Sequence, residues 1–555
     1  MARRRRSAFL RLVLLATLFG PNPPIIVSRE TTFITELLGP DGLPDYEKYA
    51  LDKSREGVTP ENNAAVLLWQ VIWPGDLEPS DYESLTAEIG LEQFPSETES
   101  LQSIHSDAVR KSIATWLIDV AKRQANQDTL DIDAQSEIVD EIIDRAMDQP
   151  WTGTQVPPLA EWVTNNRDSL DMAIKATGRS RYYSPSPSLL DDSPTLMIAI
   201  LFPDLQGVRY LARALSARAM WHLGEGRIEE AWRNLLAVHR LARLVGQGHT
   251  LVEQLIAIAC SDLACNGTVT LLDQVKVNGE WARHIQEDLA NLDRISDVPE
   301  VLDQMERLQA LDAVLYVRSY GLQAISSDPD VISLRNPNPR WAKVDWNIVL
   351  QEINYWYDRI AGAAKLPHTS ARKQEQERCG AELLAESHAV TRPAYYVASR
   401  LSRRKRSHAV ASVVACSMLP ALGTVTTIED RANTQVDLVR LAAVLAIYRT
   451  KHDKYPDSVK ELVPDVLPQL PVDHYYETPL IYDRHEEGYL LYSAGANARD
   501  DGGSNELRHI FAGHELDIMD ENEVDKVREQ IPKGADDISI RVPRPPFKLP
   551  EPASN

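Results

Sequence analysis

From about residue 59 to about residue 400, the apolar residues of this chain recur at three- and four-residue spacing almost throughout. This spacing places them on one face of a helix, so it predicts amphipathic helices that bury those faces against one another. Thr59 followed by Pro60 and Glu61 is typical of a helix start, and an amphipathic helix is expected after it. Further helices are predicted at residues 104–124, 134–147, 158–175, 250–273, 280–292, 299–323 and 343–362.

Residues 209–246 contain two helical stretches joined by a short connection that includes Gly224 and Gly226. The glycines favour a tight turn, and the small residues Ala214 and Ala219 allow the helices to approach closely. The segment resembles one tetratricopeptide unit, but no second copy follows at the expected period. Because a single unit cannot bury its own apolar face, we expect an irregular helical array in which this segment is an ordinary helical hairpin.

After Thr426 the pattern changes. Thr426 and Glu429 are spaced as in a capping box, and the apolar residues that follow lie on one face of a long helix that ends before Pro456. The stretch "PLIYDRHEEGYLLYSAG" predicts two strands joined at residues 486–488, and residues 537–543 alternate as in a third strand. The fold class is therefore mainly α, with an irregular multi-helix body and a small C-terminal α+β module in which a long helix packs on a short antiparallel sheet.

At 555 residues the chain is longer than one typical domain, and changes in composition suggest where it divides. A proline-rich stretch at residues 182–195 separates two helical parts, and a basic run precedes the C-terminal module. We expect a signal peptide or N-terminal anchor at residues 1–27, a first helical bundle at 28–195, a second helical region with the hairpin at 196–407, and the α+β module at 408–555, which carries an acidic insertion at 506–533.

The N-terminus has a basic block, Arg3 to Arg6, and then an apolar run from Leu12 to Phe19. This is the layout of an export signal, and the run is shorter than the ~20 apolar residues that cross a bilayer. We therefore expect a protein exported to the periplasm or cell envelope, with membrane contact only through an uncleaved N-terminus. The alternative is a cytoplasmic protein with a basic tail.

The overall charge limits the classes of partner. The formal net charge is −22, which argues against a general nucleic-acid binder because the phosphate backbone requires clustered Lys and Arg. The four cysteines are scattered and contain no CxxC pair, so neither a disulfide framework nor a cysteine metal site is expected.

The C-terminal module resembles a known family. A proline-broken apolar helix around Pro420 is followed in order by "LAIYRTKHDKYP", "LPVD", "PLIY", "YLLYSAGAN" and "DDGG". This order resembles the globular part of type II secretion major pseudopilins, of the pseudopilin G type, over roughly the last quarter of the chain. The resemblance implies an envelope or secretion-associated partner protein. The processing site and membrane helix of that family are absent, so a processed filament subunit is not expected.

In that family the loop after the "YS.G" strand binds calcium. The resemblance therefore places Asn497, Asp500 and Asp501 in a calcium loop, with Asp536 and Asp537 closing it from the last strand. These residue types suit calcium, which takes about six to eight oxygen ligands from carboxylates, amides and carbonyls. The alternative is an Asp-Gly turn whose carboxylates are solvated.

The sequence contains no HExxH, Gly-x-Ser-x-Gly, Walker or dinucleotide-binding motif that would indicate a reaction. Asp473 and His474 form a candidate catalytic pair, although a turn aspartate beside an exposed histidine is the simpler interpretation. The favoured function is an exported, non-enzymatic scaffold or interaction protein with a pseudopilin-like, calcium-binding module. Two alternatives stay open: a hydrolase or metalloenzyme with a pocket in the helical body, and a peptide-binding helical-repeat protein.

Overall fold

The computed structural model describes residues 22–73, 75, 77–125, 136–186, 190, 196–199, 202–274, 278–320, 343–419, 422–464, 466–476, 478–505 and 533–549. The predicted signal segment lies outside the described residues up to residue 21, and the predicted acidic insertion lies outside them up to residue 532.

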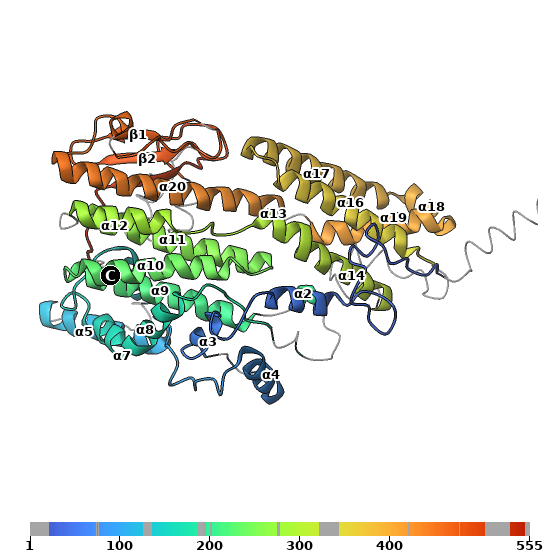
Figure 1. Cartoon of the computed structure of the whole chain (residues 1–555), viewed down its shortest axis with the longest axis horizontal. Coiled ribbons are helices and arrows are strands. Elements are labelled where there is room, and N and C mark those ends of the chain that lie inside the picture. The colour runs from blue at the N-terminus through green and yellow to red at the C-terminus, as the bar shows by residue number, and fades with distance from the viewer. Residues whose placement is uncertain are drawn as a thin grey trace, which may run out of the picture.

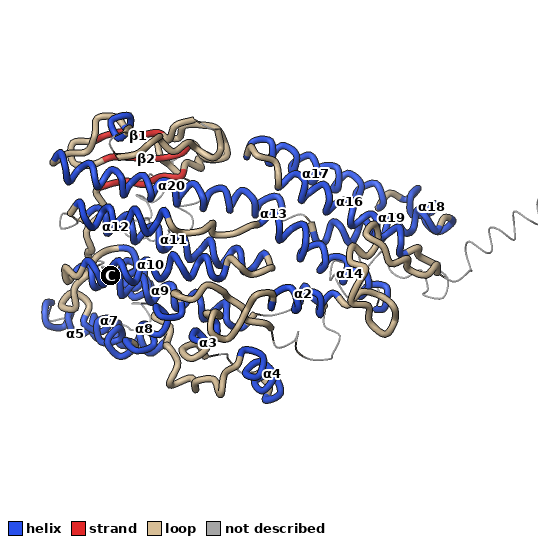
Figure 2. Tube along the Cα trace, viewed as in Figure 1, coloured by secondary structure: helices blue, strands red, loops and turns tan. Residues whose placement is uncertain are grey.

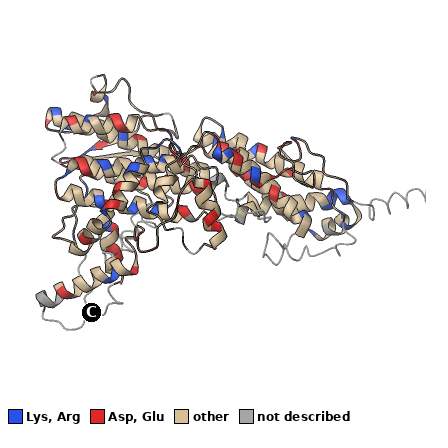
Figure 3. Ribbon diagram, turned by 60° about the horizontal axis from the view of Figure 1, so that its bottom comes forward, with Lys and Arg blue, Asp and Glu red and all other residues tan. Residues whose placement is uncertain are grey.

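The described chain is mainly helical, as the sequence predicts, with one small sheet (Figures 1 and 2). The helices of its first half are α2 (Tyr46–Arg55), α3 (Ala65–Leu68), α4 (Pro79–Ile89), α5 (Asp107–Ala125), α6 (Ser136–Asp148), α7 (Pro157–Asn165), α8 (Arg167–Ala176), the 3-10 turn η3 (Met197–Ala199), α9 (Pro203–Gly224), α10 (Ile228–Val245) and α11 (Leu251–Asp273). Those of its second half are α12 (Gly279–Ala290), α13 (Val298–Val301), the π-helical turn η4 (Leu302–Glu306), α14 (Arg307–Tyr320), α16 (Trp346–Ala364), α17 (Thr369–Val390), α18 (Pro393–Leu401), α19 (Arg403–Met418), α20 (Leu422–His452) and the 3-10 turn η6 (Val459–Leu462). Acidic and basic residues are interspersed along these helices, as is usual for amphipathic helices in water (Figure 3).

The sheet is antiparallel, with strand order β1-β2-β3. Its strands are β1 (Ile481–Arg484), β2 (Tyr489–Ser493) and β3 (Ile538–Val542). The turn between β1 and β2 is closed by a 2.9 Å hydrogen bond from the His485 backbone N–H to the Gly488 carbonyl. The long helix α20 packs against β2 and β3, and the sheet lies beside one end of that helix (Figure 1). The predicted small α+β module, a long helix on a short antiparallel sheet, is confirmed.

Buried apolar side chains form two large clusters among the described residues. The first cluster, named here the sheet-side cluster, joins α3 to α12, most of α20 and the three strands. The second, named here the distal cluster, joins α2, α13, α14, α16, α17 and α19, together with Val425 near the start of α20. Residues on both sides of the expected boundaries at 195/196 and 407/408 therefore pack together, and those boundaries stay a prediction.

One helix in the described part of the chain, α11, is long and apolar enough to cross a membrane. Its most apolar stretch is 67% buried inside the protein, and it packs against α9, α10 and α20. Thr250 and Glu253 form a complete capping box at its start. Within this structure α11 is a mostly buried helix of the sheet-side cluster.

The expected amphipathic helix after Thr59 is wrong in extent, because only the single turn α3 is helical there. The Asn63 side chain donates to the Tyr183 carbonyl (2.8 Å) and accepts from the Tyr183 backbone N–H (2.9 Å). The Ala64 backbone N–H donates to the Arg181 carbonyl at 2.7 Å. These contacts to a distant segment take up groups that a longer helix would have used for its own first turn.

The predicted hairpin at residues 209–246 is confirmed as α9 and α10, and its turn depends on a close backbone approach. A Cβ atom on Gly224 would lie 2.0 Å from the carbonyl oxygen of Trp151. Trp151 is fully buried, and its backbone N–H bonds to the Met220 carbonyl of α9. The connection after α6 can therefore pack on the end of α9 only if residue 224 has no side chain.

We expect Gly224→Ala to lower the free energy of unfolding by about 1–3 kcal/mol, because the backbone of Trp151 must move to make room. The control is Gly380→Ala on α17, where a Cβ atom would meet nothing within 4 Å and where alanine should stabilise the helix by about 0.5–1 kcal/mol. Urea unfolding of both variants followed by circular dichroism measures the difference. Equal stabilities would contradict the proposed close approach.

A candidate metal site at the rim of the sheet

The pairing of β2 with β3 brings together two loops that are distant in sequence. Ser493 at the end of β2 is opposite Ile538 at the start of β3. Beyond this pair, Asn505 and Asp536 form an isolated antiparallel bridge, and the Asp537 backbone N–H donates to the Ser504 carbonyl at 3.1 Å. The loop after β2 and the residues before β3 therefore meet at one rim of the sheet.

Two glycines allow the first loop to turn back at this rim. Gly502 and Gly503 have φ angles of 66° and 78°, which lie in the left-handed region that favours glycine. The turn directs the Gly503 backbone N–H toward Asp537 Oδ2, at 2.8 Å, and the Asp501 backbone N–H toward the same oxygen, at 3.0 Å. The two glycines therefore allow the loop to bend back toward the start of β3.

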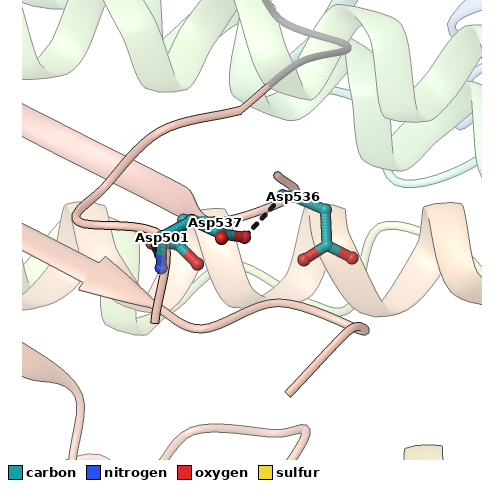
Figure 4. A group of neighbouring side chains, drawn as sticks. All are labelled: Asp501, Asp536 and Asp537. Atoms are coloured by element: carbon teal, nitrogen blue, oxygen red, sulfur yellow. Dashed lines mark hydrogen bonds between the residues drawn. The ribbon is translucent and has the colours of Figure 1, made fainter. Parts of the chain in front are cut away.

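Asp501, Asp536 and Asp537 each offer one carboxylate oxygen to a group in which these atoms all lie within 4.8 Å of one another. Asp501 and Asp537 are buried, and Asp536 is partly buried. Figure 4 shows Asp501 and Asp537 overlapping in the view, with Asp536 to one side and its backbone nitrogen directed toward Asp501. These three aspartates could hold a metal ion, and their geometry does not specify which one.

The hydrogen bonds within the group leave two oxygens unused. Asp501 accepts from the Asn497 amide at 2.8 Å and from the Asp536 backbone N–H at 3.4 Å. Asp537 Oδ2 accepts the two backbone bonds of the glycine turn. Asp536 Oδ1 and Asp537 Oδ1 are buried and have no hydrogen-bond partner among the residues that the structure describes. Buried polar atoms without a partner are rare in folded proteins, and a bound ion is one way in which such atoms are satisfied.

The pKa values of the three acids reflect this crowding. Burial raises the pKa of Asp537 to about 6, against the effect of its two backbone hydrogen bonds, and the charge on Asp501 adds to the rise. Burial also raises the pKa of Asp536. For Asp501, burial acts in the same direction, but hydrogen bonds from Asn497 and Arg499 outweigh it and hold the pKa below the usual range. A cation placed between the acids would stabilise all three in their charged form.

The other two predicted ligands lie differently. The Asn497 side chain borders the group, where its amide nitrogen donates to Asp501 and to the Gly534 carbonyl. Asp500 is turned away from the group, and its Oδ1 accepts from the Tyr492 hydroxyl at 2.9 Å and from the Gly502 backbone N–H at 3.0 Å. The structure therefore gathers three of the five predicted residues, places Asn497 beside them, and uses Asp500 to fix the turn.

Sequence reasoning missed Arg499. Its Nε donates to Asp501 Oδ1 at 2.6 Å, and its Nη2 donates to the Lys533 carbonyl at 3.0 Å. The Arg499 side chain is 54% exposed, whereas the carboxylate it reaches is almost fully buried. The loop thus supplies one positive charge of its own. Arg499 lies between the predicted ligands Asn497 and Asp500 in the sequence, and this position was the only indication that it contacts the site.

The candidate pair of Asp473 and His474 is not formed. The Asp473 carboxylate accepts from the Tyr475 backbone N–H at 2.8 Å, as a turn aspartate does. His474 Nε2 instead lies 2.7 Å from Oδ2 of Asp437 on α20. The hydrogen bond to Asp437 raises the pKa of His474. The pair of His474 and Asp437 therefore joins the loop before β1 to the long helix α20.

Comparison of the chain with family models, with curated proteins and with solved structures finds no match.

We expect Arg499→Gln to lower the free energy of unfolding by about 1 kcal/mol in the presence of a chelator, because the buried Asp501 carboxylate loses its charged donor. The matched control is Arg541→Gln, which removes the same charge from an exposed position on β3. Urea unfolding in EDTA measures both. If the two variants are equally stable, Arg499 does not compensate the charge of the group.

Proposed function

We propose that the chain is an exported, non-enzymatic scaffold whose C-terminal module binds a divalent cation, calcium, and engages an envelope or secretion-associated protein. The observation that carries the proposal is a pair of buried oxygens, one on Asp536 and one on Asp537, that have no hydrogen-bond partner among the described residues and lie next to the carboxylate of Asp501. Leaving such oxygens unsatisfied costs about 1–3 kcal/mol each, and more when they are charged. A cation coordinated by them would offset that cost.

The ligand chemistry favours calcium over the other common cations. The group offers oxygen atoms and no sulfur or imidazole, which suits hard cations. Magnesium requires a nearly regular octahedron at about 2.0–2.1 Å, whereas calcium accepts irregular sets of about six to eight oxygens. The rim has an irregular loop with an amide side chain at its border, and the family that the module resembles uses calcium at this place. The cation would fix the loop after β2 against the start of β3.

Export and partner binding rest on the order of the sequence elements. The N-terminal residues have the layout of an export signal, and the last quarter of the chain resembles the globular part of major pseudopilins. A helical body carrying such a module is suited to holding a partner protein rather than to a reaction, because no catalytic motif accompanies it. The alternatives of a hydrolase or metalloenzyme and of a peptide-binding repeat protein stay predictions.

We expect calcium to raise the melting temperature of the full chain relative to the protein in EDTA, because an ion that binds only the folded state stabilises it by mass action. Asp501→Asn combined with Asp537→Asn should abolish the calcium-dependent shift. The control combines Glu486→Gln with Glu487→Gln, which removes two exposed charges from the β1–β2 turn and should keep the shift. Differential scanning fluorimetry with calcium, magnesium and EDTA separates the cations. The ion site is wrong if calcium leaves the melting temperature of the unaltered chain unchanged.

For export, we expect the full chain to be found in the periplasmic or envelope fraction of the cells that produce it. A chain lacking residues 1–27 should stay in the cytoplasm, since the basic block and the apolar run are removed together. Immunoblots of the fractions, with one cytoplasmic and one envelope marker, measure this distribution. Recovery of the full chain with the cytoplasmic marker would favour the basic-tail alternative.

A further inference from the structure

A cavity of about 660 Å³ lies where the two apolar clusters meet. Its walls come from α10, from α13 and the connection before it, from the end of α16, the start of α17 and the connection between them, from α20 and from the loop before β1. Small-molecule sites commonly have volumes of about 300–1,000 Å³ and often lie between packed units. None of the aspartates at the rim of the sheet lines this cavity, so it is separate from the candidate metal site.

Arg243 lines the cavity from the last turn of α10 and is only 8% exposed. Its Nε donates to the Asp293 carbonyl at 3.0 Å, and its Nη1 donates to the His239 carbonyl at 2.9 Å. Its Nη2 has no partner among the described residues, and none of their carboxylates is within ion-pair distance of this guanidinium. Burial lowers its pKa to about 10. The hydrogen bonds that hold this cation beside the cavity therefore come from two neutral carbonyls.

A second guanidinium lines the same cavity. Arg440 of α20 donates through Nη2 to the Leu289 carbonyl at 3.0 Å, and its Nη1 lies 3.2 Å from Asp437 Oδ1. Asp437 is also bound by His474, so one carboxylate serves two basic side chains. The charge on Arg440 lowers the pKa of Arg243 further, and the charge on Asp293 acts in the opposite direction.

Six acids line the cavity. Asp293, Asp297 and Glu300 are exposed to water, Asp437 is bound by Arg440 and His474, and Glu429 and Asp430 bond to other groups. Glu429 accepts from the Ser296 hydroxyl at 2.9 Å and from the Val298 backbone N–H at 3.2 Å. Asp430 pairs with Arg372 at 2.6 Å. Neither acid pairs with Arg243, and the charge of Asp293 acts on it only from an exposed position, without an ion pair. A buried charge without an ion-pair partner is costly.

We propose that the cavity binds a small molecule through an oxyanion, a carboxylate or a phosphate group, held by Arg243 and Arg440. The planar guanidinium pairs well with such groups because its N–H donors match two oxygens at once. An anion placed there would use the free Nη2 of Arg243 and reduce the repulsion between the two arginines. Because the walls come from both clusters, the bound molecule would also link the helical body to α20.

The test is isothermal titration calorimetry of the full chain in Tris chloride, with inorganic phosphate in one arm and succinate in the other. We expect at least one of them to bind, and Arg243→Gln to weaken that binding by about 10-fold or more through loss of charge-assisted hydrogen bonds. The control is Arg240→Gln, which removes an exposed charge from the same helix and should leave the affinity unchanged.

A second variant covers the case in which Arg243→Gln does not fold. Asn433 lines the cavity from α20 and is half-buried. Asn433→Trp should fill the cavity without removing either arginine and should abolish binding, with circular dichroism showing that the helices are intact. The proposal is overturned if neither anion binds the unaltered chain, or if binding is the same in the folded Arg243→Gln or Asn433→Trp variants as in Arg240→Gln. A difference between the two anions identifies which oxyanion is preferred.

Discussion

The fold depends on the burial of one helix on almost all of its faces. From Leu438 to Tyr448, every residue of α20 is buried except Arg440. One side of the helix packs against α11 and α12, and the other packs against β2 and β3. Near its start, Val425 belongs to the distal cluster. A helix that is apolar all round is stable only inside a protein, so α20 requires both the helical body and the sheet. Neither the module nor the body buries its core without the shared helix.

This dependence sets the geometry of the sheet's rim. Because α20 supports β2 and β3 from one face, the register between those strands is fixed, and a one-residue slip would expose Leu491 and Ile540. The fixed register in turn places Asp537 opposite the glycine turn of the preceding loop. Three carboxylates are thus brought together by the packing of apolar side chains rather than by any attraction of their own. Arg499 offsets part of their repulsion, and two buried oxygens remain without a partner among the described residues.

What could be predicted from the sequence was local. The periodicity of apolar residues gave the helices of the body, and the alternation around residues 486–488 gave the antiparallel hairpin. The convergence of Asp501 with Asp536 and Asp537 was anticipated only through the resemblance to a family, and the sequence alone could not exclude a solvated turn. The length of α3 was wrong because Asn63 bonds to a segment 120 residues away. The pairing of His474 with Asp437 was missed for the same reason, since the two residues are 37 positions apart and share no motif.

The two candidate sites have opposite electrostatic imbalances, and α20 lies beside both. At the rim of the sheet, three acids face one exposed arginine, so the deficit is of positive charge. In the cavity, Arg440 shares the carboxylate of Asp437 with His474, and the buried Arg243 forms no ion pair among the described residues, so Arg243 is the group that lacks a counter-charge. Buried charges are usually paired, because removing a charge from water costs free energy. The acids at the rim and the arginine in the cavity lie in separate parts of the protein, so they do not pair with each other. Each site therefore needs a ligand of its own to balance its charge, which is why we propose a cation at the rim and an oxyanion in the cavity.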